Sequence, residues 1–208
     1  MTLALDHILL GVPDLDAGSD AFAALTGVAP VVGGSHPGFG TRNRLLALGA
    51  DVFLELIAPD PAQTEHGARA KAIAALPHPA LIAFAVQTTD LGAACEAAAA
   101  AGLSLARREA MSRTRPDGVR LDWTVAQFAH PAYPTLIPFA IDWQGSPHPA
   151  TTTPTGCRLR RLTVLHPDPA PLARIYAGLG LAVGVQGGLR PGFVAELDTP
   201  RGPVTLLG

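Results

Sequence analysis

The chain has 208 residues, of which 48% are hydrophobic and 15% charged, and its formal net charge is −2. This length is sufficient for a buried core, and the charge balance provides no basic surface of the kind that nucleic acid requires. No uncharged apolar stretch reaches the roughly 20 residues that span a bilayer, and no basic region precedes the first apolar run as in a secretory signal. We therefore expect a cytoplasmic protein that binds neither nucleic acid nor membrane.

The first 60 residues predict a strand, a helix and three further strands. The predicted elements are a strand (5–12), a helix (14–27) and strands at 28–32, 42–49 and 51–57. The helical spacing places Leu15, Phe22 and Leu25 on one side, and Gly27 ends the helix. The order is thus βαβββ.

The same order returns twice along the chain, which is more informative than any single motif. The second unit consists of a strand (81–87), a helix (89–102) and strands at 103–109, 119–127 and 135–143, with a turn at "RPDG" (115–118). The third begins at 159–181 and continues with "GFVAELD" (192–198) and "GPVTLLG" (202–208). The first linker, 58–80, contains a predicted helix near 65–76, and the second, 144–156, is rich in Ser, Thr and Pro.

Four fragments of the first two units are informative together: "LDHILLGVPDLD", "HPGFGTRNRLLALG", "FLELIAPDP" and "PFAIDW…HP". They resemble the glyoxalase-like domain family of the vicinal-oxygen-chelate superfamily. The resemblance implies an α+β fold in which repeated βαβββ units form a cupped mixed sheet. We expect residues 1–150 to form a glyoxalase-like domain of two units (3–60 and 80–143), and residues 157–208 to form a third βαβββ-like unit.

His7 and Glu55 are the candidate metal ligands of the first unit. In a strand, alternate residues share a face, so His7 lies with Leu5 and Leu9, and Glu55 with Phe53. The resemblance implies that these faces form the concave wall, where a histidine and a carboxylate suit Zn, Fe, Mn, Ni or Co. The other interpretation is that His7 is a hydrogen-bonded core residue.

The second unit lacks the matching ligands. Its first strand has no histidine, and the one carboxylate in its last strand is Asp142, a further ligand candidate. The third unit, with Arg161 and Leu206 at the positions equivalent to His7 and Glu55, is interpreted as a structural copy. His130, His148 and His166 lie beside or near prolines in predicted loops, where a solvated imidazole is expected.

Four further residues are candidates for substrate binding. The glycine-rich stretch "GGSHPGFGTRNR" (33–44) is predicted to be a loop that presents His36 and Asn43, together with Thr41 and Arg42, to a ligand. Arg113, at a strand end, is a candidate contact for a substrate anion, and Trp123 could offer its indole to a flat substrate. The alternatives are a solvated hairpin, a solvated arginine and a core tryptophan.

Two functions remain open from the sequence. One is a metalloenzyme for a small carbonyl-bearing or vicinal-oxygen-bearing substrate, of the lyase, isomerase or dioxygenase class, in which Glu55 is the base if no metal binds. The other is a metal-free protein that binds or sequesters a small molecule. No motif indicates a nucleotide cofactor. The apolar side of the third unit needs a cover, and we favour a homodimer over packing within the chain.

Overall fold

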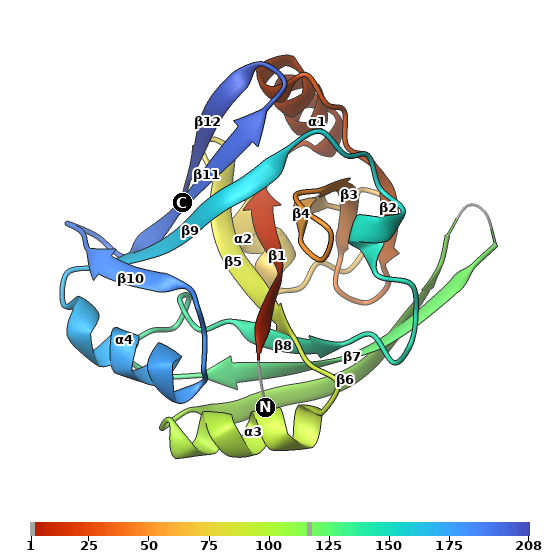
Figure 1. Cartoon of the computed structure of the whole chain (residues 1–208). Coiled ribbons are helices and arrows are strands. Elements are labelled where there is room, and N and C mark those ends of the chain that lie inside the picture. The colour runs from red at the N-terminus through yellow and green to blue at the C-terminus, as the bar shows by residue number, and fades with distance from the viewer. Residues whose placement is uncertain (1–2, 116–117) are drawn as a thin grey trace.

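Two β-sheets and their connecting helices form the computed structural model, which describes residues 3–115 and 118–208 (Figure 1). Eight strands form one curled sheet with the order β2-β3-β4-β1-β5-β8-β7-β6, and four form a second with the order β10-β9-β11-β12. The α+β fold of repeated units with a cupped mixed sheet is confirmed. The turn predicted at 115–118 lies partly outside the described residues.

The elements of the first two units follow the predicted order. The first unit contains β1 (Ala4–Gly11), α1 (Leu15–Thr26), β2 (Val31–His36), β3 (Thr41–Ala47) and β4 (Phe53–Pro59). The linker helix is α2 (Ala68–Ala74). The second unit contains β5 (Ala80–Gln87), α3 (Leu91–Ala100), β6 (Ser104–Thr114), β7 (Arg120–Ala129) and β8 (Phe139–Asp142). In both units the first strand pairs in parallel with the last, and β1 and β5 join the units as antiparallel neighbours.

The sequence predicted a loop at the glycine-rich stretch 33–44, but in the structure most of this stretch is strand. Strands β2 and β3 continue through it and leave a short turn between His36 and Thr41, in which Gly38 and Gly40 have positive φ. His36 and Asn43 are therefore strand residues, and their directions are fixed by the pleat of the sheet.

Helix α1 buries a different stripe from the one predicted. Asp14 caps its N-terminus by accepting a hydrogen bond from the backbone of Ala17, and Gly27 ends it in the left-handed conformation, with φ 84°. Leu15 and Phe22 are buried as expected, but Leu25 is 51% exposed. The buried face continues instead through Thr26, whose hydroxyl donates to the carbonyl of Phe22 and is thereby satisfied.

The third segment has the predicted order of elements but a different pairing of strands. It contains β9 (Arg158–His166), α4 (Pro169–Gly178), β10 (Gly184–Gly187), β11 (Gly192–Thr199) and β12 (Gly202–Leu207). Its first strand pairs in parallel with β10, the strand directly after the helix, and antiparallel with β11. This segment therefore keeps the βαβββ order while its strand pairing differs from that of the first two units, and its assignment as a separate unit stays a prediction.

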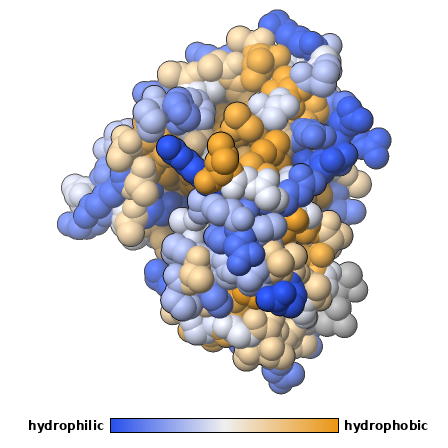
Figure 2. Space-filling model, turned by 90° about the vertical axis from the view of Figure 1, so that its left-hand side faces the viewer, coloured by the Kyte–Doolittle hydropathy of each residue, from blue (hydrophilic) through white to orange (hydrophobic). Residues whose placement is uncertain are grey.

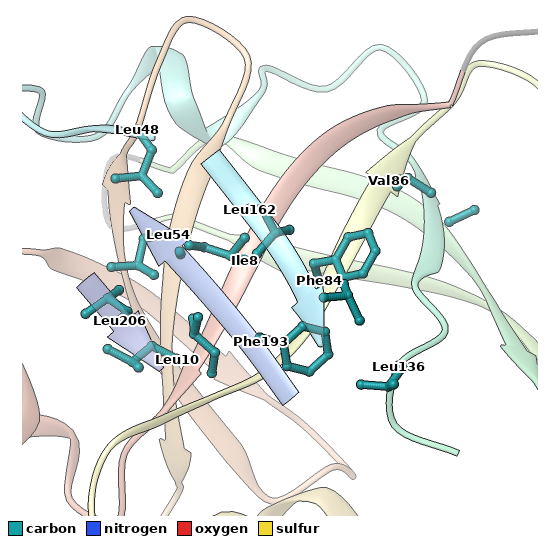
Figure 3. Packing of buried hydrophobic residues seen from close by; sticks show 14 of the residues in the cluster. Ile8, Leu10, Leu48, Leu54, Phe84, Val86, Leu136, Leu162, Phe193 and Leu206 are labelled. Atoms are coloured by element: carbon teal, nitrogen blue, oxygen red, sulfur yellow. The ribbon is translucent and has the colours of Figure 1, made fainter. Parts of the chain in front are cut away.

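The apolar side of the third segment is covered within the chain. Figure 1 shows β9 and β11 in front of β1 and β5, with α2 on the opposite face of the large sheet. Leu162 and Phe193 from the second sheet belong to the same buried cluster as Ile8, Leu54 and Phe84 from the first (Figure 3). The convex face of the large sheet already covers this surface, so no second chain is needed there, and a homodimer stays a prediction.

The outer surface beside the third segment mixes polar and apolar residues. In Figure 2, hydrophobic side chains gather in the upper half of this face, with hydrophilic ones on both sides. Within the part of the chain that the structure describes, no helix has the length and apolar character that crossing a membrane would require.

We predict that the two sheets unfold together. Phe193→Ala removes a ring that is 4% exposed and lies 6.2 Å from Phe84, between centroids. We expect a loss of about 3 kcal/mol in the free energy of unfolding, measured by chemical denaturation with one transition. The matched control is Leu189→Ala, because Leu189 is 100% exposed and should change stability by less than about 0.5 kcal/mol. Two separate transitions in the wild-type protein would contradict a shared core.

Candidate active site

The concave face of the large sheet surrounds a cavity of about 400 Å³. Strands from both units and helix α2 contribute to its wall. Six of the residues that the sequence predicted for the site line this cavity: His7, His36, Asn43, Glu55, Arg113 and Trp123. The structure therefore brings the candidates together, while their chemical roles remain predictions.

His7 and Glu55 converge in this cavity, as their alternation along β1 and β4 predicted. Nε2 of His7 lies 3.6 Å from Oε2 of Glu55. Both side chains are buried, and the imidazole of His7 stacks on the ring of Phe53 with the centroids 4.4 Å apart. One ring face of His7 therefore packs against the wall while its Nε2 is directed at the carboxylate.

Asp6 determines which nitrogen of His7 faces Glu55. The pairing between β1 and β5 shifts register between Leu5 and His7, so Asp6 departs from regular alternation and its carboxylate reaches the His7 ring. Nδ1 of His7 donates to Oδ1 of Asp6 at 2.5 Å. Because this contact holds Nδ1 and its proton against Asp6, the other ring nitrogen, Nε2, is the one that faces Glu55.

Two other donors hold the buried carboxylate of Asp6. The indole Nε1 of Trp143 donates to its Oδ2 at 2.9 Å, and Nε2 of His148 lies 3.0 Å from the same oxygen. Burial alone raises the pKa of Asp6, but the hydrogen bonds from His148, His7 and Trp143 outweigh it and lower the pKa well below the usual carboxyl range. The prediction of a solvated His148 is therefore wrong: its side chain is 14% exposed and anchored on Asp6.

Glu55 has one oxygen held by Asn43 and the other directed at His7. Nδ2 of Asn43 donates to Oε1 of Glu55 at 2.7 Å. Burial raises the pKa of Glu55, whereas His36, His7 and this hydrogen bond lower it, and the charge of Arg69 lowers it further. The net shift is downward, so the carboxylate is ionised at neutral pH.

His36 positions Asn43. Its Nε2 lies 3.2 Å from Nδ2 of Asn43 and 3.8 Å from Oε1 of Glu55, and its Nδ1 lies 2.9 Å from the hydroxyl of Thr41. Since the amide nitrogen of Asn43 can only donate, Nε2 of His36 accepts and the proton resides on Nδ1. Burial lowers the pKa of His36, as does the nearby charge of Arg113, against the opposing effect of Glu55.

Arg113 reaches the site from the opposite edge of the curled sheet. Its Nη1 lies 3.4 Å from Oδ1 of Asn43. A Cβ at Gly33 would lie 2.9 Å from Nη1 of Arg113, and one at Gly34 would lie 2.6 Å from its Cδ. Two glycines in β2 thus leave the space through which the arginine passes. Trp123 lines the cavity and also packs on Trp143, with ring centroids 5.6 Å apart.

Two other candidates lie outside the site. Asp142 does not line the cavity, because its neighbours Ile141 and Trp143 take the concave positions and alternation turns it away. Arg42 pairs instead with Asp16 of α1, at 3.3 Å. Thr41 lines the cavity and orients His36, as described above.

Sequence reasoning missed Asp6, Trp143 and Arg69 as site residues. Asp6 is adjacent to His7, and regular alternation would place the two on opposite faces. Arg69 lies in α2, in a segment interpreted as a linker, and its guanidinium lies over the ring of Phe139, 5.7 Å from the centroid. The "PFAIDW…HP" motif contains Trp143 and His148, and was the only signal that could have indicated them.

The donor set does not fit a resident metal ion. In residues 3–115 and 118–208, no group of three or more His, Cys, Asp and Glu side chains is arranged to hold one. His7 Nε2 and Glu55 Oε2 are two suitable donors, but Asn43 already occupies the second oxygen of Glu55. The positive charges of Arg69 and Arg113 also act on Glu55 and would oppose a dication. Other parts of the cavity wall are apolar and contain Val125 and Ile141.

The family model described as "Glyoxalase-like domain" matches residues 5–180. The chain belongs to the glyoxalase-like domain family. This confirms the resemblance seen in the sequence. Among curated proteins, none matches.

Solved structures similar to this chain have low sequence identity, and those with a TM-score above 0.5 share its fold. A hypothetical protein from Staphylococcus aureus is 16% identical, with 100% of this chain and 85% of that chain covered and a TM-score of 0.68. A triple mutant of 4-hydroxymandelate synthase from Streptomyces coelicolor is 17% identical, covering 99% of this chain and 62% of that one at a TM-score of 0.52. Methylmalonyl-CoA epimerase from Mycobacterium tuberculosis is 24% identical over 66% of this chain and 86% of that chain, with a TM-score of 0.45.

We predict that Asp6→Asn destabilises the protein by about 2–4 kcal/mol, because the buried donors lose a charged acceptor. Because the pKa of Asp6 is lowered in the folded protein, its carboxylate contributes fully to the free energy of unfolding above about pH 5. This contribution is progressively lost as the pH falls below 3.8, the ordinary pKa of the group. The measurement is chemical denaturation of both proteins across this pH range. Asp51→Asn is the control, since Asp51 is exposed. A difference between wild type and Asp6→Asn that does not shrink in acid would contradict the assignment.

Proposed function

We propose that this protein is a glyoxalase-like enzyme that removes a proton from the carbon next to a carbonyl group of a small molecule. Glu55 is the base. The supporting observation is its buried carboxylate, of which Asn43 holds Oε1 while Oε2 lies in the cavity beside His7. A base held in one orientation and kept ionised is what such a step requires.

The step uses groups that line the cavity. The C–H bond of the substrate breaks, its proton goes to Oε2 of Glu55, and its electron pair moves onto the carbonyl oxygen as an enolate. A guanidinium stabilises the developing oxygen charge, and Arg69, which lines the cavity and interacts electrostatically with Glu55, is the candidate. Return of the proton at the same or a neighbouring atom gives an isomerase, and loss of a leaving group gives a lyase.

Deuterium exchange tests this proposal. Candidate carbonyl compounds, starting with α-oxoaldehydes and acyl-CoA compounds, are incubated with the protein in D2O and followed by NMR. We expect catalysed exchange that Glu55→Gln reduces at least 100-fold, of the order of the loss of a general base. Glu96→Gln is the matched control, because Glu96 is exposed on α3 and distant in sequence from the site. Exchange that survives Glu55→Gln would disprove the role of Glu55.

The pH dependence follows from the lowered pKa of Glu55. The base loses activity only when it is protonated, and its pKa lies below the ordinary value of 4.5. The acid limb of the exchange rate should therefore fall below pH 4.5, in a range where the fold must be checked by circular dichroism. A limb centred above this value would contradict the environment described for Glu55.

One observation favours a metal-dependent enzyme as a second candidate. A histidine whose Nδ1 donates to a carboxylate is typical of metal ligands, and the Asp6–His7 contact has this form. In that case His7 and Glu55 would hold a divalent ion that polarises the substrate oxygen. Elemental analysis of protein purified without chelator separates the two: near-stoichiometric metal that is lost in His7→Ala supports the second candidate. We expect substoichiometric metal and exchange that resists chelators.

A further inference from the structure

Arg113 enters the cavity with incomplete hydrogen bonding. Its Nε is buried and has no hydrogen-bond partner among the described residues, and its Nη1 makes a long contact of 3.4 Å to Asn43. A guanidinium has five N–H donors, and a buried donor without an acceptor is unfavourable. The glycines at 33 and 34 provide space for this side chain in the interior of the fold. The Nε–H of the Arg113 guanidinium therefore lacks a hydrogen-bond acceptor among the described residues.

The cavity carries an excess of positive charge. Arg69 and Arg113 both line it and both interact electrostatically with Glu55, the carboxylate between them. Glu55 is the one carboxylate among the described residues that line the cavity, and the carboxylate of Asp6 behind His7 is already engaged by His7, Trp143 and His148. Arg107 adds no free charge, because it pairs with Glu109 at 2.7 Å. A ligand with one negative charge would balance the site.

The remaining wall suits a flat apolar group. Trp123 and Trp143 lie next to each other in the cavity, and Phe53 and Phe139 flank the His7 ring. Aromatic side chains provide broad, rigid surfaces on which a planar ring packs. The volume of about 400 Å³ lies within the range of sites for ligands much larger than a three-carbon oxoaldehyde.

We infer that the ligand is an aromatic monocarboxylate. Its carboxylate accepts hydrogen bonds from Arg113 and is attracted by Arg69, and its ring lies against Trp123 and Trp143. The inference rests on the proposed function only in one respect, namely that the same molecule presents a carbonyl group to Glu55. Bidentate pairing between guanidinium and carboxylate would satisfy the free Nε.

Three probes separate the contributions of charge and ring. Phenylpyruvate has the ring, the carbonyl and the carboxylate; phenylacetone lacks the carboxylate, and pyruvate lacks the ring. By isothermal titration calorimetry at pH 7 we expect phenylpyruvate to bind at least tenfold more tightly than either of the others. Equal affinity for phenylpyruvate and phenylacetone, or no binding of phenylpyruvate, would overturn the inference.

Variants then locate the charge contact. Arg113→Met should weaken the binding of phenylpyruvate at least tenfold and leave that of phenylacetone unchanged, and Arg113→Lys should restore part of the loss. Arg108→Met is the matched control, because Arg108 is an exposed residue of the same strand that does not line the cavity. Unchanged binding of phenylpyruvate to folded Arg113→Met disproves the contact.

Exchange and binding distinguish the inference from the proposed function. Tight binding of phenylpyruvate without catalysed deuterium exchange would leave the inference standing and refute the role of Glu55 as base. Catalysed exchange into phenylacetone as efficient as that into phenylpyruvate would refute the inference and leave the role of Glu55 intact.

Discussion

The carboxylate of Asp6 is buried in the protein, and an ionised group there costs several kcal/mol unless donors surround it. One donor is the neighbouring His7 of β1, and two come from a distant part of the chain: Trp143, directly after β8, and His148 in the segment that follows. The segment after β8 must therefore lie against β1. This placement brings the indole of Trp143 to the cavity wall and directs Nε2 of His7 toward Glu55. The geometry of the site therefore depends on the hydrogen bonds that the Asp6 carboxylate accepts.

The same principle explains the environment of the neighbouring carboxylate, Glu55. Glu55 is ionised and buried, and it is balanced by a hydrogen bond from Asn43 and by arginine charges rather than by a third and fourth metal ligand. Asn43 in turn contacts His36 and Arg113, so residues from both edges of the curled sheet meet at one carboxylate. The arginines that line the cavity around this carboxylate are the observation from which we infer an anionic ligand.

The sequence predicted those site residues that follow the regular alternation of side chains along a strand, and it missed those that do not. His7 and Glu55 lie in regular strands, so alternation was enough to bring them together. Asp6 could not be found in this way, because the register shift beside it arises from pairing with β5, some 80 residues later in the chain. The glycines at 33 and 34 suggested a loop, whereas they provide space within a strand for Arg113.

The fold was predictable to a similar extent. Repetition of the element order indicated the units, and the first two pair as the resemblance implies. The third repeats the order but not the pairing, since the choice of neighbour for β9 depends on its packing against the convex face and not on local pattern. The same packing covers the apolar side of the third segment within one chain.

Asp6 orients His7 in this structure, and the most direct test is a long-range ¹H–¹⁵N correlation spectrum of the histidine side chains. Comparison with His7→Gln assigns the signals of His7. The structure predicts that Nδ1 of His7 is protonated and that its proton is strongly deshielded by the short contact to Asp6, with this deshielding lost in Asp6→Asn. An unprotonated Nδ1 in the wild-type protein, with the proton on Nε2, would contradict the account.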